Sequence, residues 1–314
     1  MVFGPSFRRT AGFFAAGVLS LVLLSGCAPS TPTASSSTPA GSAHAASPAS
    51  QSTPELPEGT AAIPAYSPLN LPNAYDFTQP APERPAVDKT YFEDAAFVGD
   101  SRTDGFLIYS GIGRGKNLTS NGLSIFQLAE KKALTIDGET YTLLEALAME
   151  EYGKVYLCLG VNELGIYNDE GFYQSYCQAI DAIRTIQPNA VIYIQGLIPL
   201  NEEVAAQVLK RDYLKNDHLR VYNDLMRRAA EEKQVVFLDL YTEFADENGQ
   251  LPAEASKDGV HLAKEWCQQW LAYLQTHTVD PDTLYPNGAP IPEAPPAEEP
   301  SAPTPETEIR SVAS

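Results

Sequence analysis

The sequence predicts an α/β fold built on a parallel sheet whose two faces are covered by helices. Three observations support this prediction. Continuous apolar runs of strand length, such as KVYLCLG at 154–160, alternate with stretches of helical periodicity. Such runs are typical of strands that are buried on both faces. The helical stretches between successive strands supply the long crossover connections that parallel strands need.

The elements follow one another in chain order within residues 87–280. Apolar runs predict four strands, and a fifth segment is a weaker strand candidate. The strands are expected at 95–100, 154–160, 190–199 and 235–240, with the weaker candidate at 116–126. Helical spacing predicts helices at 142–153, 170–188, 218–234 and 261–277. Gly153 and Pro188 supply stop signals for the first two helices.

The N-terminal residues 1–27 have the three parts of a secretory signal. Arg8 and Arg9 form a positive start, residues 11–24 are apolar, and LSGC at 24–27 follows at once. A plain signal peptide and an uncleaved anchor helix are the alternatives. The LSGC sequence resembles the lipobox of bacterial lipoproteins, which implies that the Cys27 thiol receives diacylglycerol. By this resemblance the protein is exported and lipid-anchored to the outer face of a bacterial membrane.

Two segments of biased composition flank the predicted domain. Residues 28–86 are rich in Ser, Thr, Pro and Ala, and residues 281–314 are rich in Pro and Glu. Both have too few large apolar residues to offset the entropy of ordering, so we expect them to be disordered. The first would act as a tether between membrane and domain. Residues 87–280 are then one domain.

Net charge and cysteine usage exclude several classes of protein. The formal net charge is −19 at pH 7, which disfavours binding to nucleic acid. Besides Cys27 the chain has Cys158, Cys177 and Cys267, and no CxxC pair. These spacings indicate neither a disulfide framework nor a zinc knuckle, so we interpret the three as small core residues. We expect no metal and no other cofactor.

Polar residues follow the predicted strands where ligands bind in open α/β sheets. The first strand leads into GDS at 99–101, and the second long strand leads into Asn162. A loop after the strand at 235–240 ends in KDGVHL at 257–262. Because parallel strands end at one edge, we expect these residues to gather there.

His261 is the histidine best placed to act as a general base. The other three lie in the tether, at a helix entry and at a frayed helix end: His44, His218 and His277. Asp258 lies three positions before His261. Activation of a serine nucleophile needs an imidazole that takes the hydroxyl proton and a carboxylate that fixes its tautomer. The residues therefore predict a catalytic triad of Ser101, His261 and Asp258.

Three motifs together resemble the SGNH (GDSL-like) hydrolase family. They are GDS at 99–101, GVN at 160–162 and DGVH at 258–261, in the order found in that family. Each motif alone is weak, but their order and positions make the set specific. The resemblance implies that Ser101 is the nucleophile, that Asn162 supplies an oxyanion side chain, and that Asp258 and His261 complete the triad. It also implies a flavodoxin-like three-layer α/β/α sandwich with a mostly parallel sheet.

Two details depart from the family pattern or stay open. The family most often has Asp after the oxyanion asparagine, whereas this chain has Glu163, which leaves the support of Asn162 undefined. The oxyanion hole would combine the side chain of Asn162 with the backbone N–H groups of Ser101 and a glycine. Gly122 is our choice for that glycine. The competing glycines are Gly113, Gly115 and Gly138, the last of which reads as a turn glycine.

The residues and the resemblance agree on transfer of an acyl group to water. We expect a serine esterase that acts on short acyl, especially acetyl, esters of envelope or extracellular carbohydrate. A lipase or thioesterase of the same fold is the alternative for the substrate. The domain has many tyrosines that could stack on sugar rings, although the preferred interpretation is that most of them are interior or half-buried. They include Tyr109, Tyr141, Tyr167 and Tyr173.

Two other classes of protein are alternatives to the esterase. A metallophosphoesterase could use the oxygen and nitrogen ligands of Asp100, Glu163, Asp258 and His261, but such sites usually contain several histidines. A surface binding module could keep the fold without turnover. Next to the nucleophile, Arg102 and Asp104 are expected to be solvent-facing loop charges, and Arg102 is the first candidate for substrate preference.

Overall fold

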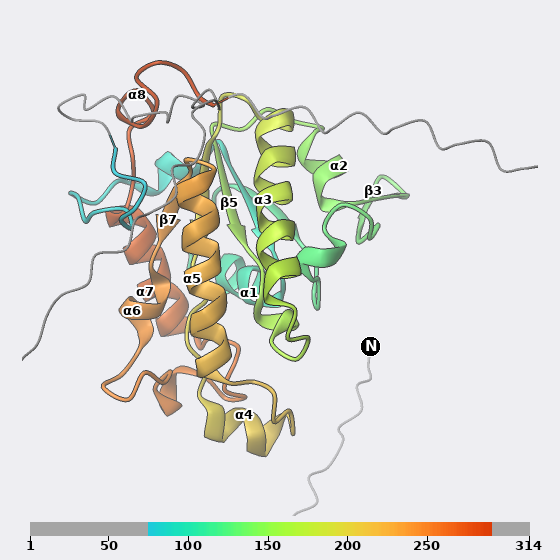
Figure 1. The fold of residues 1–314 in the computed structure, drawn as a ribbon, viewed down its shortest axis with the longest axis vertical. Helices are drawn as coiled ribbons and strands as arrows, with labels where there is room; N and C mark the ends of the chain where they lie inside the picture. Colours follow the sequence, from blue (N-terminus) through green and yellow to red (C-terminus); the bar gives the residue numbers. More distant parts are fainter. Residues whose placement is uncertain (1–74, 291–314) are drawn as a thin grey trace, which may run out of the picture. The chain divides into compact units, whose positions relative to one another are not determined.

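A five-stranded parallel sheet forms the centre of the protein in a computed structural model that describes residues 75–290 (Figure 1). The strands are β1 (Ala95–Gly99), β2 (Lys116–Thr119), β5 (Lys154–Cys158), β6 (Val191–Gln195) and β7 (Val236–Leu238). Their order is β2-β1-β5-β6-β7, which is the flavodoxin-like order. The chain turns from one side of β1 to the other between β2 and β5. In such sheets ligands bind beyond the strand ends at that point.

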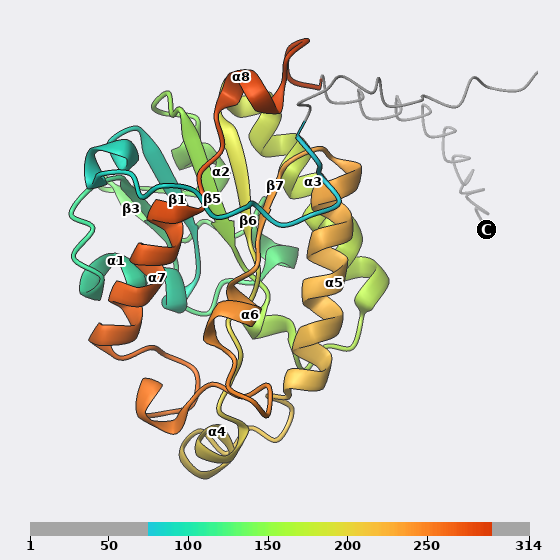
Figure 2. The same cartoon turned by 90° about the vertical axis from the view of Figure 1, so that its left-hand side faces the viewer.

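Helices cover both faces of the sheet, so the predicted three-layer α/β/α sandwich is confirmed. On one face α1 (Ser101–Tyr109) packs against α7 (Lys264–Thr276). On the other face α3 (Asp169–Ile186) packs against α5 (Asn216–Glu232) and α2 (Leu143–Leu147). Figure 2 shows the sheet between these two layers. β1 and β6 are buried along their whole length because both of their faces are covered.

Stacked aromatic rings fix the layer that contains α7. Phe97, Tyr156 and Tyr193 lie on three neighbouring strands in register. The ring centroids of Phe97 and Tyr156 are 5.0 Å apart, and those of Tyr156 and Tyr193 are 4.6 Å apart. Trp270 of α7 packs on Phe106 of α1 with its ring centroid 4.7 Å away. This packing holds the start of α7, and therefore the preceding loop, against the helix that begins at Ser101.

Shorter elements connect the layers. They are η1 (Lys89–Phe92), η2 (Ile125–Gln127), β3 (Leu134–Ile136), β4 (Glu139–Tyr141), η3 (Val161–Glu163), α4 (Glu202–Val208), α6 (Leu240–Phe244), η4 (Ala253–Ala255) and α8 (Pro281–Leu284). β3 and β4 form a separate antiparallel pair around Gly138, whose φ of +90° fits its prediction as a turn glycine.

Several predicted elements are shorter in the structure, and the strand predicted at 190–199 is limited to β6. The weak strand candidate at 116–126 is a strand only to Thr119, and a turn and η2 follow it. The helix predicted at 142–153 is limited to α2. The helix predicted at 261–277 begins at Lys264, because Leu262 forms an isolated β-bridge with Ser256. His261 is therefore a loop residue just before the helix.

Packed structure extends beyond the predicted range 87–280 at both ends. The Ala81 N–H donates to Phe237 O at 2.9 Å, and the Arg84 N–H donates to Thr276 O at 2.7 Å. At the other end α8 buries Leu284. Part of the predicted tether and part of the predicted tail thus lie on the domain. The predicted signal and Cys27 fall outside the described residues.

The described residues give two further results on membrane and redox features. Among residues 75–290, no helix is both long and apolar enough to cross a membrane. The three cysteines in this range are buried and free, as expected for small core residues.

Candidate active site

Ser101 lies at the carboxyl edge of the sheet as the first residue of α1. Asp100 caps this helix, and its Oδ1 accepts a hydrogen bond of 2.9 Å from the Arg102 N–H. Gly99 of β1 pairs in register with Cys158 of β5, so the residues that follow these two strands leave the sheet at the same level. The backbone N–H of Ser101 belongs to the first turn of the helix, where N–H groups lack partners within the helix.

Three side chains form a continuous hydrogen-bonded chain. Ser101 Oγ lies 2.8 Å from His261 Nε2, although 160 residues separate the two in sequence. His261 Nδ1 lies 2.7 Å from Asp258 Oδ2. When Nδ1 donates to this carboxylate, Nε2 is left to accept the proton of Ser101. The structure therefore brings together all three residues of the predicted triad.

Asp258 is held by hydrogen bonds within its own loop. Its Oδ1 accepts from the backbone N–H groups of Val260 (3.0 Å) and His261 (2.9 Å) and from Ser256 Oγ (3.1 Å). Partial burial alone would raise the pKa of Asp258. The hydrogen bonds from the His261 side chain and from the loop backbone outweigh burial and hold the pKa well below its ordinary value. Asp258 is therefore ionised and fixed beside the imidazole.

Asn162 lies beyond the end of β5 and lines the same cavity as Ser101. Its Nδ2 donates to Leu123 O at 2.9 Å and to Asp100 Oδ2 at 3.2 Å. Gly160 begins the turn with a φ of +140°, and a Cβ there would lie 3.0 Å from Leu197 Cδ1. Glycine at this position therefore allows the sharp exit from β5 that directs Asn162 toward Ser101.

Of the four candidate oxyanion glycines, Gly122 lies in the site. It lines a cavity together with Ser101, Asn162 and His261, and its φ is +71°. Gly113 and Gly115 belong to the connection that enters β2 from the other edge of the sheet. A Cβ at Gly115 would lie 3.1 Å from the backbone oxygen of Ala95, the first residue of β1.

This geometry agrees with a match to a known family. A family model described as the GDSL-like Lipase/Acylhydrolase family matches residues 97–290, which span β1 to the end of the described chain. The chain belongs to this family. It is accordingly a hydrolytic esterase of the GDSL-like lipase and acylhydrolase class.

The chain is also similar to several solved structures. They include one described as a platelet activating factor from Streptococcus pneumonia, a GDSL-like lipase from Bacteroides thetaiotaomicron and a carbohydrate esterase family 3 protein from Talaromyces cellulolyticus. Their sequence identities are 20%, 16% and 14%, with TM-scores of 0.48, 0.45 and 0.40. The matches cover 63%, 59% and 58% of this chain and 91%, 87% and 93% of those chains. No curated protein matches the chain.

Glu163 explains how this GDSL-like hydrolase supports Asn162 without the usual Asp. The Glu163 side chain is fully buried, and its Oε1 accepts a hydrogen bond from the Ile125 N–H. It thereby joins the turn of Asn162 to the loop that contains Gly122. Burial raises the pKa of Glu163 to about 7 and that of Asp100 to about 6. The sequence left this role open because only the fold shows what Glu163 reaches.

Arg102 does not face solvent, so that prediction was wrong. Its side chain is 5% exposed, and Nη1 donates to Ile198 O at 2.9 Å. The first turn of α1 directs it inward, beneath the site, because position 102 lies on the buried side of the helix. Asp104 is half-buried and accepts hydrogen bonds from Asn117 Nδ2 (3.0 Å) and Thr119 Oγ1 (3.3 Å).

The four tyrosines named for sugar stacking lie in different environments. Tyr173 is buried and Tyr141 half-buried, in agreement with the preferred interpretation. Tyr109 and Tyr167 are exposed, whereas most tyrosines of residues 75–290 are buried or half-buried, as expected. Tyr167 stacks on His218 with a ring-centroid distance of 4.6 Å, whereas Tyr109 lies near His261.

Two cavities meet at His261. The first, of about 370 Å³, contains Ser101, Gly122 and Asn162, and its far wall is formed by four residues that sequence reasoning missed: Leu209, Arg211, Tyr213 and Leu214. The second, of about 350 Å³, is lined by Tyr109, Asp258, Leu262 and two lysines, Lys257 and Lys264. The long connection after the strand at 190–199 could have indicated these four residues, because long loops at this edge of the sheet often form binding sites.

The metallophosphoesterase hypothesis finds no support within residues 75–290. In that range, His, Cys, Asp and Glu side chains form no group of three or more that could hold a metal ion. Asp100 instead caps α1, Glu163 holds the backbone of Ile125, and Asp258 holds His261. Each of these carboxylates thus has a hydrogen-bonding role within the protein.

Proposed function

We propose that this hydrolase is an exported, lipid-anchored serine esterase that removes short acyl groups, chiefly acetyl, from envelope or extracellular carbohydrate. The observation that carries the catalytic part is the chain of hydrogen bonds from Asp258 through His261 to Ser101. The export and anchoring part is supported by the signal-like residues 1–27 and the lipobox-like Cys27.

In the proposed first step, His261 Nε2 removes the proton of Ser101 as Oγ attacks the ester carbonyl carbon. The oxyanion accepts hydrogen bonds from the Ser101 N–H, the Gly122 N–H and Asn162 Nδ2. His261 then gives the proton to the alcohol oxygen, which leaves, and the acyl group stays on Ser101. Water attacks this acyl-enzyme with His261 again as base, which releases the acid and restores the serine.

Asn162 changes one hydrogen bond during this step. Both hydrogens of its Nδ2 have acceptors, namely Leu123 O at 2.9 Å and Asp100 Oδ2 at 3.2 Å. The oxyanion would replace the longer contact, to Asp100, and the shorter one to Leu123 would keep the amide in place. The ester carbonyl oxygen gains its negative charge only as the tetrahedral state forms, so a hydrogen bond from Asn162 Nδ2 is stronger there than to the bound ester and favours the transition state.

A short acyl group suits the first cavity. Its volume of about 370 Å³ includes the oxyanion hole, and Asn121 and Arg211 give it polar walls beside the apolar Leu209 and Val260. Long acyl chains need a mainly apolar surface along their length. Because Val161, Leu209, Leu214 and Val260 also line the cavity, the acyl-length series below decides between acetyl-sized and longer acyl groups.

The decisive experiment measures hydrolysis of 4-nitrophenyl esters of increasing acyl length and of acetylated glycans. We expect the wild type to prefer acetyl and Ser101→Ala to lose about a thousandfold or more of kcat. A serine-directed fluorophosphonate should label the wild type and not Ser101→Ala. Ser175→Ala, on α3, is the matched control and should retain activity and labelling. Full activity in Ser101→Ala would exclude the proposed nucleophile, and rising kcat/KM with chain length would favour a lipase.

Lipid anchoring is tested separately at Cys27. Expression of the full chain in a bacterial host should give a membrane-bound protein whose N-terminal residue carries diacylglycerol by mass spectrometry. Cys27→Ala should appear in the soluble exported fraction. Unmodified Cys27 in the wild type would exclude the lipoprotein and leave the plain signal peptide or the anchor helix.

A further inference from the structure

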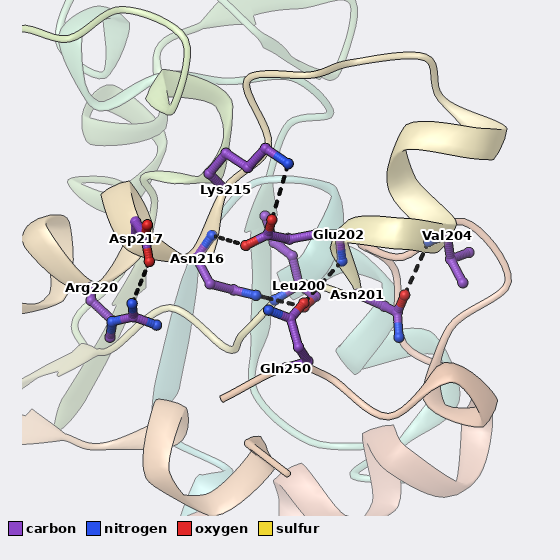
Figure 3. Close-up of polar contacts among 9 residues, drawn as sticks. All are labelled: Leu200, Asn201, Glu202, Val204, Lys215, Asn216, Asp217, Arg220 and Gln250. Atoms are coloured by element: carbon purple, nitrogen blue, oxygen red, sulfur yellow. Dashed lines mark hydrogen bonds and ion pairs between the residues drawn. The ribbon is translucent and has the colours of Figure 1, made fainter. Parts of the chain in front are cut away.

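Residues 200–216 form a segment that lines one side of the first cavity. Hydrogen bonds join the two ends of this segment. The side chain of Asn216 accepts from the Leu200 N–H at 2.8 Å and donates to the Leu200 O at 2.8 Å. Glu202 accepts from the Asn216 N–H at 2.8 Å and from Lys215 Nζ at 3.0 Å. Figure 3 shows these contacts joining the start of α4 to the start of α5. The two ends of the segment are therefore held together.

The same segment contacts two loops of the candidate site, the loop of Asp258 and His261 and the loop that follows Asn162. The Asn201 N–H donates to Gly259 O at 2.9 Å, next to the loop of Asp258 and His261. The Tyr213 ring lies over Gly165, where a Cβ would be 3.1 Å from the ring. Arg211, between these anchors, is exposed and lines the cavity that contains Ser101. Its position relative to the reacting atoms is thus set by the fold.

The cations at the site are among those that have no carboxylate partner within the described part of the domain. Seven lysine and arginine side chains pair with carboxylates at 4 Å or less: Arg114, Lys116, Lys154, Lys215, Arg220, Arg227 and Lys233. Arg211, Lys257 and Lys264 have no carboxylate within that distance among residues 75–290. All three line the two cavities that meet at His261.

The three cations at the site belong to a chain of strongly negative net charge. The formal net charge of −19 repels an anionic polymer at long range. Binding of such a polymer therefore requires cations close to the reacting ester, where their attraction exceeds the screened repulsion of distant carboxylates. Arg211 on one side of His261 and Lys257 with Lys264 on the other meet this requirement.

We propose that Arg211, Lys257 and Lys264 bind carboxylate or phosphate groups of an acidic glycan that carries the scissile acyl ester. The inference rests on the proposed esterase function and specifies its substrate class. The ester carbonyl at Ser101 points its oxygen toward Gly122 and Asn162, and the alcohol oxygen lies at His261, which returns its proton. Because His261 borders both cavities, a glycan attached through that oxygen can reach cations on either side.

The test compares matched acetylated polymers on the full exported protein. Chemically O-acetylated polygalacturonate is the carboxylate probe, an O-acetylated polymer of sugar phosphates is the phosphate probe, and O-acetylated galactan is the neutral reference. We expect kcat/KM to be higher for at least one anionic probe than for galactan, with a preference that shrinks as salt rises. The probe with the higher value identifies the anion.

Single variants then assign the preference to residues. Arg211→Gln, Lys257→Gln and Lys264→Gln should each lower the ratio of anionic to neutral kcat/KM by about three- to tenfold. Arg84→Gln is the matched control, because Arg84 is exposed and its N–H bonds to Thr276 at the opposite end of α7 from Lys264. It should leave the ratio unchanged.

Failure of this inference can be told apart from failure of the proposed function. Hydrolysis of 4-nitrophenyl acetate that depends on Ser101 establishes the esterase independently of substrate charge. If that activity is present, equal kcat/KM for neutral and anionic polymers overturns the inference. Unchanged ratios in all three site variants overturn it as well. Absence of Ser101-dependent hydrolysis of 4-nitrophenyl acetate overturns the proposed function itself.

Discussion

The buried carboxylate of Glu163 accepts a hydrogen bond from the backbone N–H of Ile125 and so links the two parts of the candidate oxyanion hole. One part is the turn that carries Asn162, and the other is the loop that carries Gly122. The contact Asn162 Nδ2 to Leu123 O adds a second link at 2.9 Å. Glu163 is thus a positioning residue, because it bonds to the backbone near the donors and not to the reacting atoms.

Shortening or removing Glu163 should misplace these donors. Glu163→Asp withdraws the carboxylate from Ile125 and Glu163→Ala removes it, so kcat should fall by about tenfold or more with little change in KM. Glu163→Gln keeps an acceptor oxygen at the same distance and should retain most of the activity. Steady-state kinetics with 4-nitrophenyl acetate measure kcat and KM separately. Equal losses in the Gln and Asp variants would contradict a positioning role.

Glu163 should also make stability depend on pH. Burial raises the pKa of Glu163 from 4.5 to about 7, so the folded protein holds a proton that the unfolded chain releases. The contribution to stability is full below about pH 4.5 and is lost as pH rises to about 7, at roughly 1.4 kcal/mol per pKa unit. Urea denaturation should show that Glu163→Gln loses less unfolding free energy over this range than the wild type. The exposed-loop control Glu247→Gln should keep the wild-type slope.

Asn162→Ala should lower kcat by about a hundredfold or more, because one oxyanion donor is worth about 2.7–4 kcal/mol. Fluorophosphonate labelling of Ser101 should slow in parallel, since its adduct also has a tetrahedral oxyanion. Asn117→Ala is the control, because Asn117 lies in β2 and contacts Asp104. A variant Asn162→Ala with undiminished turnover would remove Asn162 from the mechanism.

The proximity of Ser101, Asp258 and His261 could be predicted from sequence because each residue follows a recognisable strand or precedes a recognisable helix. Ser101 ends the first apolar run, and Asp258 with His261 lies just before the closing helix. Parallel strands place such ends at one edge, which explains why residues 160 positions apart meet at 2.8 Å. Local pattern and fold class together were enough for this part of the site.

Other parts of the site depend on packing that sequence does not reveal. Arg102 follows the nucleophile directly, but its burial depends on how α1 sits on the sheet. Arg211 lies in a connection without a motif, and its place in the cavity results from hydrogen bonds at Leu200 and Asn216. Charged side chains are usually exposed, so the sequence predicted that the Arg102 side chain faces solvent.

Arg102 should contribute to stability and not to substrate preference. Arg102→Met keeps much of the apolar stem but leaves the buried Ile198 O without its 2.9 Å hydrogen bond. We expect the free energy of unfolding to fall by about 1–3 kcal/mol. Urea denaturation measures this loss, and the ratio of kcat/KM between acetyl esters of different alcohols should stay constant. A changed kcat/KM ratio together with wild-type stability would show that Arg102 affects substrate preference.

Gly99 is required for close packing beneath the nucleophile. A Cβ at this position would lie 2.2 Å from Thr103 Oγ1 and 2.8 Å from Cys158 O. Because Cys158 O is backbone of β5, relief would have to come from a shift of α1, which carries Ser101. Gly99→Ala should therefore lower the free energy of unfolding by about 1–3 kcal/mol and reduce kcat through a longer Ser101–His261 contact. Gly105→Ala, in the same helix with no atom within 4 Å of the added Cβ, is the control and should keep both stability and kcat. Wild-type stability and kcat in Gly99→Ala would show that α1 can shift without cost.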